Sequence, residues 1–231
     1  MNKAYNVDCL KAMREIPDKY FDLAVVDPPY FSGPEKRGYY GKTGGGLGGR
    51  KDYTVSPEWS VPGEKYFKEL QRCAKHYIVW GCNYFDFKFA PGRIVWDKCN
   101  GNSSFSDCEI AATDLHDSVR MFRYMWNGMM QGKSIAEGEV MQGNKQLNEK
   151  RIHPTQKPIA LYSWIFSKYA MPGYKILDTH LGSGSSRIAA LDAALDFIGF
   201  ELDPHYFELQ EARFENAAAQ SSLWRADDGT P

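Results

Sequence analysis

Short apolar segments recur along the chain and alternate with segments in which apolar residues repeat at helical spacing. Runs rich in β-branched and aromatic residues, short enough to be buried strands, occur at 21–26, 77–81, 93–98, 108–112, 119–126, 175–178 and 197–202. Helical periodicity occurs at 10–16, 62–75, 159–169, 186–194 and 204–219. The alternation predicts an α/β fold, and residues 220–231 are expected to form a frayed tail.

Composition limits the classes of protein that fit this pattern. With 231 residues, 43% hydrophobic and 14% aromatic, the chain can form one sizeable core with a small appendage. The net charge of −1 does not indicate a nucleic-acid-binding protein, so any contact with DNA depends on local basic patches. The five cysteines show no CxxC spacing, and we find neither a signal peptide nor a membrane-spanning stretch. We expect a reduced, cytoplasmic protein without structural disulfides, metal or membrane contact.

The first candidate for chemistry is Asp27-Pro28-Pro29-Tyr30, which directly follows the predicted strand 21–26. Two consecutive prolines cannot continue a strand, so Asp27 lies at its carboxyl end, where α/β sheets bind ligands. The Asp27 carboxylate and the Pro28 carbonyl are two acceptors that suit an amino group with two hydrogens, and the Tyr30 ring can stack on a base. The alternative is an ordinary Asp-Pro-Pro turn with a packing tyrosine.

A second candidate site begins where the strand 175–178 ends. A glycine-rich turn at 179–185 leads into a helix, and Glu201 ends the next strand about twenty residues further on, where Rossmann-type sheets place an acid on ribose hydroxyls. The dinucleotide fingerprint GxGxxG and a P-loop lysine are both absent. The pattern therefore favours a nucleoside with a short zwitterionic tail over a dinucleotide or ATP.

The segment His-Pro-Thr-Gln-Lys-Pro at 153–158 precedes a predicted helix. Pro158 fits the first turn of that helix, whose free backbone amides favour an anion. His153, Thr155 and Lys157 add further hydrogen-bond donors. The alternative is an ordinary helix start.

The motifs Asp-Pro-Pro-Tyr at 27–30 and His-Pro-Thr-Gln-Lys-Pro at 153–158 together resemble those of the amino-group DNA methyltransferases, which methylate adenine N6 or cytosine N4. The resemblance covers roughly residues 5–215, and the catalytic motif precedes the cofactor turn, as in the permuted beta class. It implies a Rossmann-like sheet with circularly permuted motif order, S-adenosylmethionine as cofactor and double-stranded DNA as substrate. Asp at the first motif position is more typical of adenine enzymes, and Ser of cytosine enzymes.

The resemblance also implies roles for particular residues. Asp27, Pro28, Pro29 and Tyr30 are the expected catalytic residues. The expected cofactor contacts are Asp8, Cys9, Asp27, His153, Thr155, Gln156, Lys157, Asp178, His180, Leu181, Gly182, Ser183, Gly184, Ser185, Glu201 and Leu202. His180-Leu181 stands where the family usually has Pro-Phe; Leu181 can keep the apolar contact, and the sequence gives no physical reason for His180. Asp8 is also placed to cap the helix that follows.

Two basic segments are candidates for DNA contact. The glycine-rich loop at 33–56, which we interpret as functional rather than as a plain linker, carries Lys36, Arg37, Lys42, Arg50 and Lys51. Residues 119–152 carry Arg120, Arg123 and Lys133, and lie between the catalytic half (1–118) and the cofactor-binding half (153–219). Family resemblance gives this insert the role of target recognition; a lid or an oligomer contact is the alternative.

The function predicted from the sequence is methylation of adenine N6 in duplex DNA, with the base flipped out of the helix. The alternatives are an N4-cytosine enzyme, a methyltransferase for RNA or a protein amide, and a non-catalytic DNA-binding protein with a degenerate cofactor pocket. Whether the chain forms a homodimer or acts beside a restriction enzyme stays open.

Overall fold

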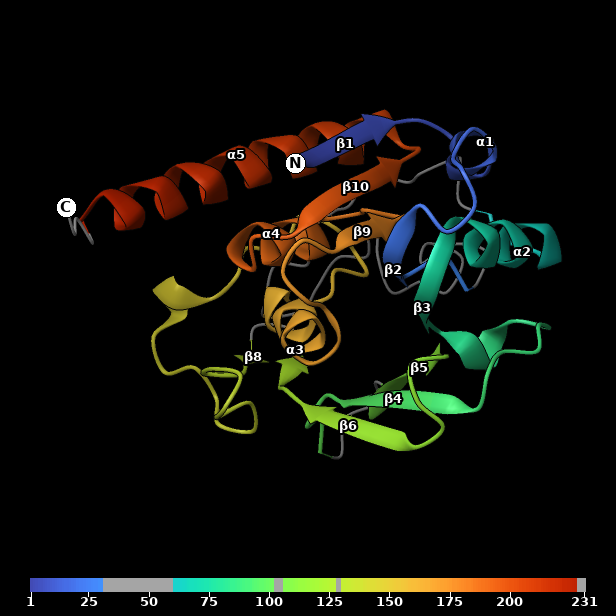
Figure 1. The fold of residues 1–231 in the computed structure, drawn as a ribbon. Helices are drawn as coiled ribbons and strands as arrows, with labels where there is room; N and C mark the ends of the chain where they lie inside the picture. Colours follow the sequence, from blue (N-terminus) through green and yellow to red (C-terminus); the bar gives the residue numbers. More distant parts are fainter. Residues whose placement is uncertain (31–59, 102–105, 128–129, 228–231) are drawn as a thin grey trace, which may run out of the picture.

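The computed structural model describes residues 1–30, 60–101, 106–127 and 130–227, and side chains as far as residue 220. Within these residues a central sheet has the strand order β1-β10-β9-β2-β3-β5-β4-β6 (Figure 1). The strands are β1 (Asn2–Asn6), β2 (Phe21–Val26), β3 (Ala74–Trp80), β4 (Gly92–Asp97), β5 (Cys108–Thr113), β6 (Val119–Arg123), β9 (Lys175–Asp178) and β10 (Asp196–Glu201). Neighbouring strands are parallel except at β5, which is antiparallel to both β3 and β4.

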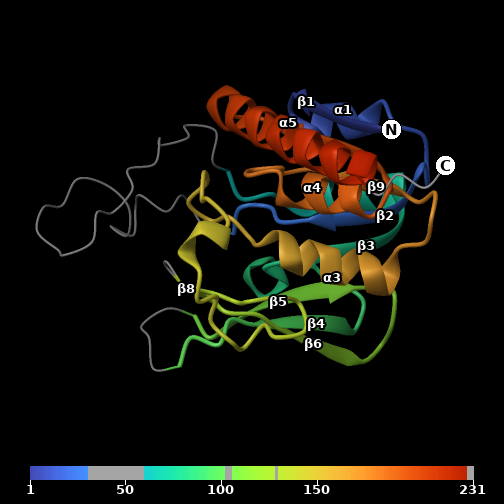
Figure 2. The same cartoon turned by 90° about the vertical axis from the view of Figure 1, so that its left-hand side faces the viewer.

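Helices cover both faces of the sheet (Figures 1 and 2). They are α1 (Cys9–Arg14), α2 (Glu64–Cys73), α3 (Ile159–Tyr169), α4 (Ser185–Asp192) and α5 (Pro204–Asp227). Leu23 and Val25 of β2 are buried with residues of α3 and α4, whereas Ala24 and Val26 are buried with residues of α1 and α2. This alternation along one strand shows that β2 is buried on both faces, as central strands of α/β sheets are. The predicted Rossmann-like α/β fold is confirmed.

The two halves of the chain meet in the middle of the sheet, where β2 pairs in parallel with β9 through Leu23–Ile176 and Ala24–Leu177. The carboxyl ends of β1, β10, β9 and β2 therefore reach one edge. Because β5 runs the other way, its first residues, not its last, lie at that edge. Segments that are far apart in the sequence are thus brought together there.

The sequence-based assignment differs from the structure in three places. Strand β1 was not predicted, because Asn2, Lys3 and Asn6 interrupt its apolar pattern. The predicted strand 119–126 ends at Arg123, and Trp126–Asn127 (β7) pairs with Met130–Gln131 (β8) in a separate small sheet. Residues 220–227 continue helix α5, so the predicted tail is wrong there; this stretch contains neither glycine nor proline. Residues 228–231 lie outside the described part of the chain, as does the whole glycine-rich loop 33–56.

In the described part of the chain, no helix is both long and apolar enough to span a membrane.

Candidate active site

A cavity of about 650 Å³ opens at the edge where the carboxyl ends of the parallel strands meet, a size usual for small-molecule sites. Most of the predicted catalytic and cofactor residues line it: Asp8, Cys9, Asp27, Pro28, Pro29, Tyr30, His153, Thr155, Gln156, Lys157, His180, Leu181, Gly182, Ser183, Ser185, Glu201 and Leu202. The first turn of α2 and the segment before it, residues 60–66, complete the wall. The fold therefore joins the two candidate sites seen in the sequence into one cavity.

A chain of four charges lies on the side of this cavity that carries Asp27. Lys157 Nζ is 2.5 Å from Asp27 Oδ2 and 2.8 Å from Glu109 Oε2. Lys98 Nζ is 2.5 Å from Glu109 Oε1 on the far side of that carboxylate. The Lys157 side chain is only 2% exposed and that of Asp27 14%. Two carboxylates and two ammonium groups therefore balance each other in a largely dehydrated place.

Tyr30 is held by this chain and by its neighbours. Its hydroxyl accepts a hydrogen bond from Lys157 Nζ at 2.9 Å and lies 3.0 Å from both Asp27 Oδ1 and Glu109 Oε2, either of which can accept its single proton. Its ring stacks on Tyr84 with centroids 5.0 Å apart and planes 5° apart. Gly81 has φ +70°, and a Cβ there would lie 2.3 Å from Tyr30 Cδ1, so glycine is required.

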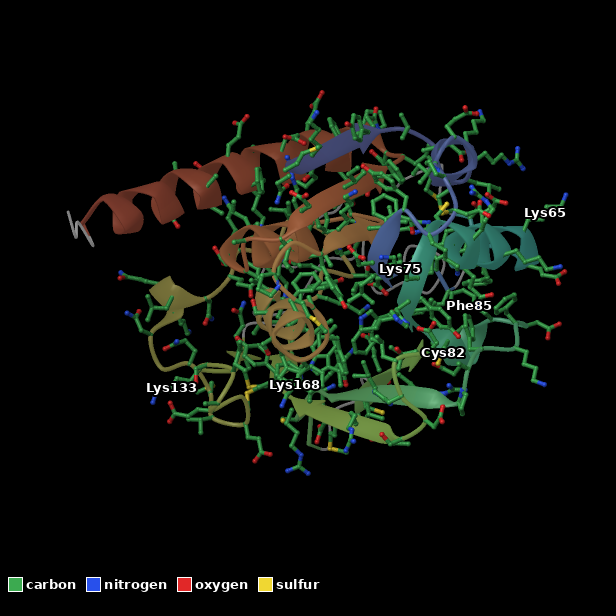
Figure 3. The ribbon with its side chains drawn as sticks, viewed as in Figure 1. Lys65, Lys75, Cys82, Phe85, Lys133 and Lys168 are labelled. Carbon is green, nitrogen blue, oxygen red and sulfur yellow. The ribbon has the colours of Figure 1, made fainter. Side chains whose placement is uncertain are left out.

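Tyr84 belongs to a short 3-10 helix, η2 (Cys82–Tyr84), that follows β3. Cys82 is the first residue of this helix and Phe85 directly follows it (Figure 3); the Phe85 ring meets the Tyr30 ring edge-on at 6.3 Å. Tyr30, which the sequence predicts to be catalytic, is thus fixed by a second tyrosine, Tyr84, that is not among the site residues predicted from the sequence.

Burial and charge act against each other on the pKa values of this chain. Burial raises the pKa of the Asp27 carboxyl above its ordinary value, although Lys157 opposes that shift. Burial alone would lower the pKa of Lys157, but the Asp27 and Glu109 carboxylates raise it. Burial would likewise raise the pKa of Glu109, yet Lys157 and Lys98 bring it to about 2. Within this chain of charges, acid therefore neutralises Asp27 before Glu109.

The other side of the cavity carries the carboxylates of Asp8 and Glu201. Asp8 caps α1, because its Oδ1 accepts the Lys11 amide at 3.0 Å. Glu201 Oε2 accepts the Gly182 amide at 2.8 Å, and Oε1 accepts the Asp203 amide at 2.9 Å. Each carboxylate oxygen has a further lone pair that a ligand hydroxyl can use. The two acids therefore have a structural role that is compatible with binding a ligand.

The segment 153–158 packs directly on the glycine-rich turn. The His153 ring meets the Tyr206 ring at 4.4 Å, and a Cβ on Gly182, where φ is +50°, would lie 3.5 Å from His153. Burial lowers the pKa of His153 to about 3, so its ring is neutral at physiological pH. Gln156 Oε1 accepts the Ile152 amide at 2.9 Å, which ties this segment to the residues before it.

Two of the predicted cofactor residues are not part of the cavity wall, Asp178 and Gly184. Asp178 Oδ1 accepts the His180 amide at 3.0 Å, and Oδ2 accepts the Ser186 hydroxyl at 2.5 Å. Gly184 has φ +72° and lies against the side chain of Gln210. In the structure both residues shape the glycine-rich turn from behind, and their contact with the cofactor stays a prediction.

His180 has a packing role that the sequence did not reveal. Its Nδ1 is 2.9 Å from Thr179 Oγ1, its ring meets the Tyr66 ring edge-on at 5.4 Å, and its Nε2 is 3.9 Å from Cys9 Sγ. Burial lowers the pKa of His180 to about 4. His180 is therefore a neutral ring that fills the space between α1, α2 and the turn.

The residues predicted to contact DNA do not line the cavity. Lys36, Arg37, Lys42, Arg50 and Lys51 lie outside the described residues. Arg120 is exposed on β6, and Arg123 pairs with Asp97 at 3.3 Å and Glu139 at 2.6 Å. Lys133 projects outward (Figure 3) and pairs with Glu137 at 2.8 Å. Contact of these residues with DNA stays a prediction.

Comparison with known proteins places the chain in a family. The model of the DNA methylase family, which comprises N6 and N4 methyltransferases, matches residues 21–212, and the chain belongs to this family. The type II methyltransferase M.HinfI of Haemophilus influenzae is 24% identical over 246 residues, which cover 92% of this chain and 68% of M.HinfI. M.HpaI of Haemophilus parainfluenzae is 23% identical over 239 residues, which cover 90% and 73%.

Solved structures share the fold. The M1.HpyAVI–SAM complex is 18% identical with a TM-score of 0.52, over 92% of this chain and all (100%) of that one. The cytosine-N4-specific PvuII DNA methyltransferase is 14% identical with a TM-score of 0.56, over 93% of this chain and 86% of that one. The chain is thus a DNA methyltransferase of the N6/N4 amino class, and S-adenosylmethionine is its cofactor, as predicted.

We predict that the neutral state of His180 makes folding stability depend on pH. Between pH 6.5 and 4, His180 in the unfolded chain binds a proton, whereas His180 in the folded chain, with its pKa of about 4, stays neutral. The free energy of unfolding therefore falls as the pH drops, by up to about 1.4 kcal/mol per pH unit for this one group. In His180→Asn this contribution is absent, so urea unfolding should show a shallower decline with acid than in the wild type.

Measurements at pH 8, where neither state protonates the ring, give the pH-independent difference between the two chains. Parallel stability curves for the wild type and His180→Asn between pH 6.5 and 4.5 would contradict the prediction.

Proposed function

We propose that this chain transfers a methyl group from S-adenosylmethionine to N6 of adenine in duplex DNA, with the adenine flipped into the cavity. The observation that carries the proposal is the position of the Asp27 carboxyl group in the cavity wall, next to Pro28 and 2.5 Å from Lys157 Nζ. An aspartate at this motif position is the feature by which the sequence resembles the adenine enzymes.

The chemistry asks the protein to improve a weak nucleophile. The lone pair of an exocyclic amino nitrogen is delocalised into the ring, so the nitrogen reacts poorly. Asp27 and the Pro28 carbonyl would each accept a hydrogen bond from one of its two N–H groups. This arrangement favours a pyramidal nitrogen with its lone pair directed at the methyl group. This is catalysis by orientation and electrostatics. When bound, the cofactor supplies a methyl group on a positively charged sulfur; the proton that the amino nitrogen gives up would pass to Asp27 and on to water.

The cavity wall also suggests how each ligand is held. We assign Asp8 and Glu201 to the hydroxyl and amino groups of the nucleoside part of the cofactor, since both carboxylates retain acceptor capacity. Gly182 leaves room for a close backbone approach. The stacked pair Tyr30–Tyr84 would form the platform for the flipped base. Flipping is required because the target amino group is paired and stacked inside a duplex.

Cytosine N4 is the second candidate for the target atom. The likeness in fold to the PvuII enzyme, which is cytosine-N4-specific, favours it. Adenine and cytosine both present an amino group beside a ring nitrogen that accepts hydrogen bonds, so the same two acceptors at Asp27 and Pro28 suit either base.

Mapping modified bases tests the target directly. DNA from a methylation-deficient host that expresses the chain should carry N6-methyladenine at one short sequence motif, detected by sequencing that distinguishes modified bases. N4-methylcytosine would overturn the choice of base and keep the mechanism. An unmodified genome in a host with abundant folded protein would contradict the proposal, and the matching host with an empty vector is the control.

Asp27→Asn tests the catalytic assignment, because it keeps the shape of the side chain and removes its charge. Lys157 keeps Glu109 as a partner, so the fold should persist. We expect methyl transfer to duplex DNA to fall by at least about 100-fold, the loss seen when one preorganised group is removed. Binding of S-adenosylmethionine, measured by calorimetry, should persist.

Asp117→Asn, at an exposed position before β6, is the matched control and should transfer methyl groups at the wild-type rate. Wild-type turnover in Asp27→Asn would refute the assignment of Asp27.

A further inference from the structure

Lys157 has no proton left for a ligand. A lysine ammonium group donates three hydrogen bonds, and here the acceptors are Asp27, Glu109 and the Tyr30 hydroxyl, at 2.5, 2.8 and 2.9 Å. The side chain is also nearly fully buried, with Nζ 5.7 Å from the centroid of the Trp80 ring. The hydrogen bonds of Lys157 therefore serve the protein, although the sequence suggested contact with the cofactor.

The Asp27–Lys157 pair is neutral by itself, so charge balance does not require Glu109. Burying a second carboxylate and a second ammonium, Lys98, adds the cost of removing both from water. What the second pair adds is position. A lysine bound to one carboxylate can swing around it, whereas a lysine held between two carboxylates and a hydroxyl has one place for its nitrogen.

The fold supplies Glu109 from a separate part of the sheet. Glu109 lies opposite Trp96 in the β4–β5 ladder, two strands away from Asp27, with β3 between β2 and β5. It also shares Tyr30 with Asp27, since the tyrosine hydroxyl is 3.0 Å from both carboxylates. Glu109 thus reaches both groups that hold the Asp27 carboxylate, without lining the cavity itself.

From this arrangement we infer that Glu109 is a positioning residue for methyl transfer: it fixes Lys157 and Tyr30, and through them the orientation of the Asp27 carboxylate toward the target amino group. The inference rests on the proposed function of Asp27. It adds a residue from β5 to the catalytic apparatus and gives Lys157 the role of aligning that apparatus.

Glu109→Gln tests the inference, because it keeps the size of the side chain and removes its charge. We expect kcat for methyl transfer to fall by about 10- to 100-fold, the scale of a small misplacement of a reacting group. The Kd for S-adenosylmethionine should stay within about twofold of the wild-type value. Glu109→Asp should recover part of kcat, and Glu215→Gln, exposed on α5, should behave as the wild type.

The pH profile separates positioning from general damage. The titratable groups that act on Asp27 or are acted on by it are Lys157, Glu109, Tyr30, Tyr66, Tyr162 and Asp178. Glu109 adds a negative charge that makes Asp27 easier to protonate. Its removal should therefore move the acid limb of kcat to lower pH, whereas a damaged fold would lower kcat without that shift.

The outcomes are distinguishable. Wild-type kcat in Glu109→Gln, or loss of cofactor binding together with kcat, would overturn the inference. If Glu109→Gln does not fold, the double variant with Lys98→Met restores the charge balance; its kcat should stay low, and a wild-type kcat would again overturn the inference. If Asp27→Asn is inactive while Glu109→Gln is fully active, only the role of Glu109 fails; full activity of Asp27→Asn would remove the proposed function itself.

Discussion

The catalytic side of this molecule depends on the burial of one lysine. An ammonium group out of water needs an acceptor for each proton, and a carboxylate next to it needs a cation. Lys157 meets both demands by binding Asp27, Glu109 and Tyr30 at once. The consequence is that the loop before α3, the end of β2 and the start of β5 are fixed relative to one another by charge, at the edge of the cavity.

The topology of the sheet makes that contact available. The catalytic half and the cofactor half of the chain are joined by the pairing of β2 with β9, which aligns the ends of their strands along one edge. The same edge receives the first residues of β5, because β5 is antiparallel to its neighbours. One cavity can then hold a cofactor beside Glu201 and a target amino group beside Asp27.

The sequence predicted those parts of the site that follow a local rule. Asp27 was found because two prolines end its strand, and Glu201 because it ends a strand after a glycine-rich turn. Glu109 was missed because it begins a strand, and only the antiparallel direction of β5, a property of the whole sheet, places it at the ligand edge. Lys157 was selected as a hydrogen-bond donor of the segment 153–158, but its partners Asp27 and Glu109 lie on other segments of the chain. Strand β1 was not predicted, because its position at the edge of the sheet tolerates polar residues that interrupt the apolar pattern.

The most direct test is a crystal structure of the protein with a non-reactive S-adenosylmethionine analogue and a DNA duplex that carries the target base. We predict that the base is flipped into the cavity and that its amino nitrogen lies within hydrogen-bond distance of both Asp27 and the Pro28 carbonyl. Lys157 should still bind Asp27 and Glu109 in that complex. A Lys157 that has left Asp27 to bind the cofactor, or an amino group that is far from Asp27, would contradict this account.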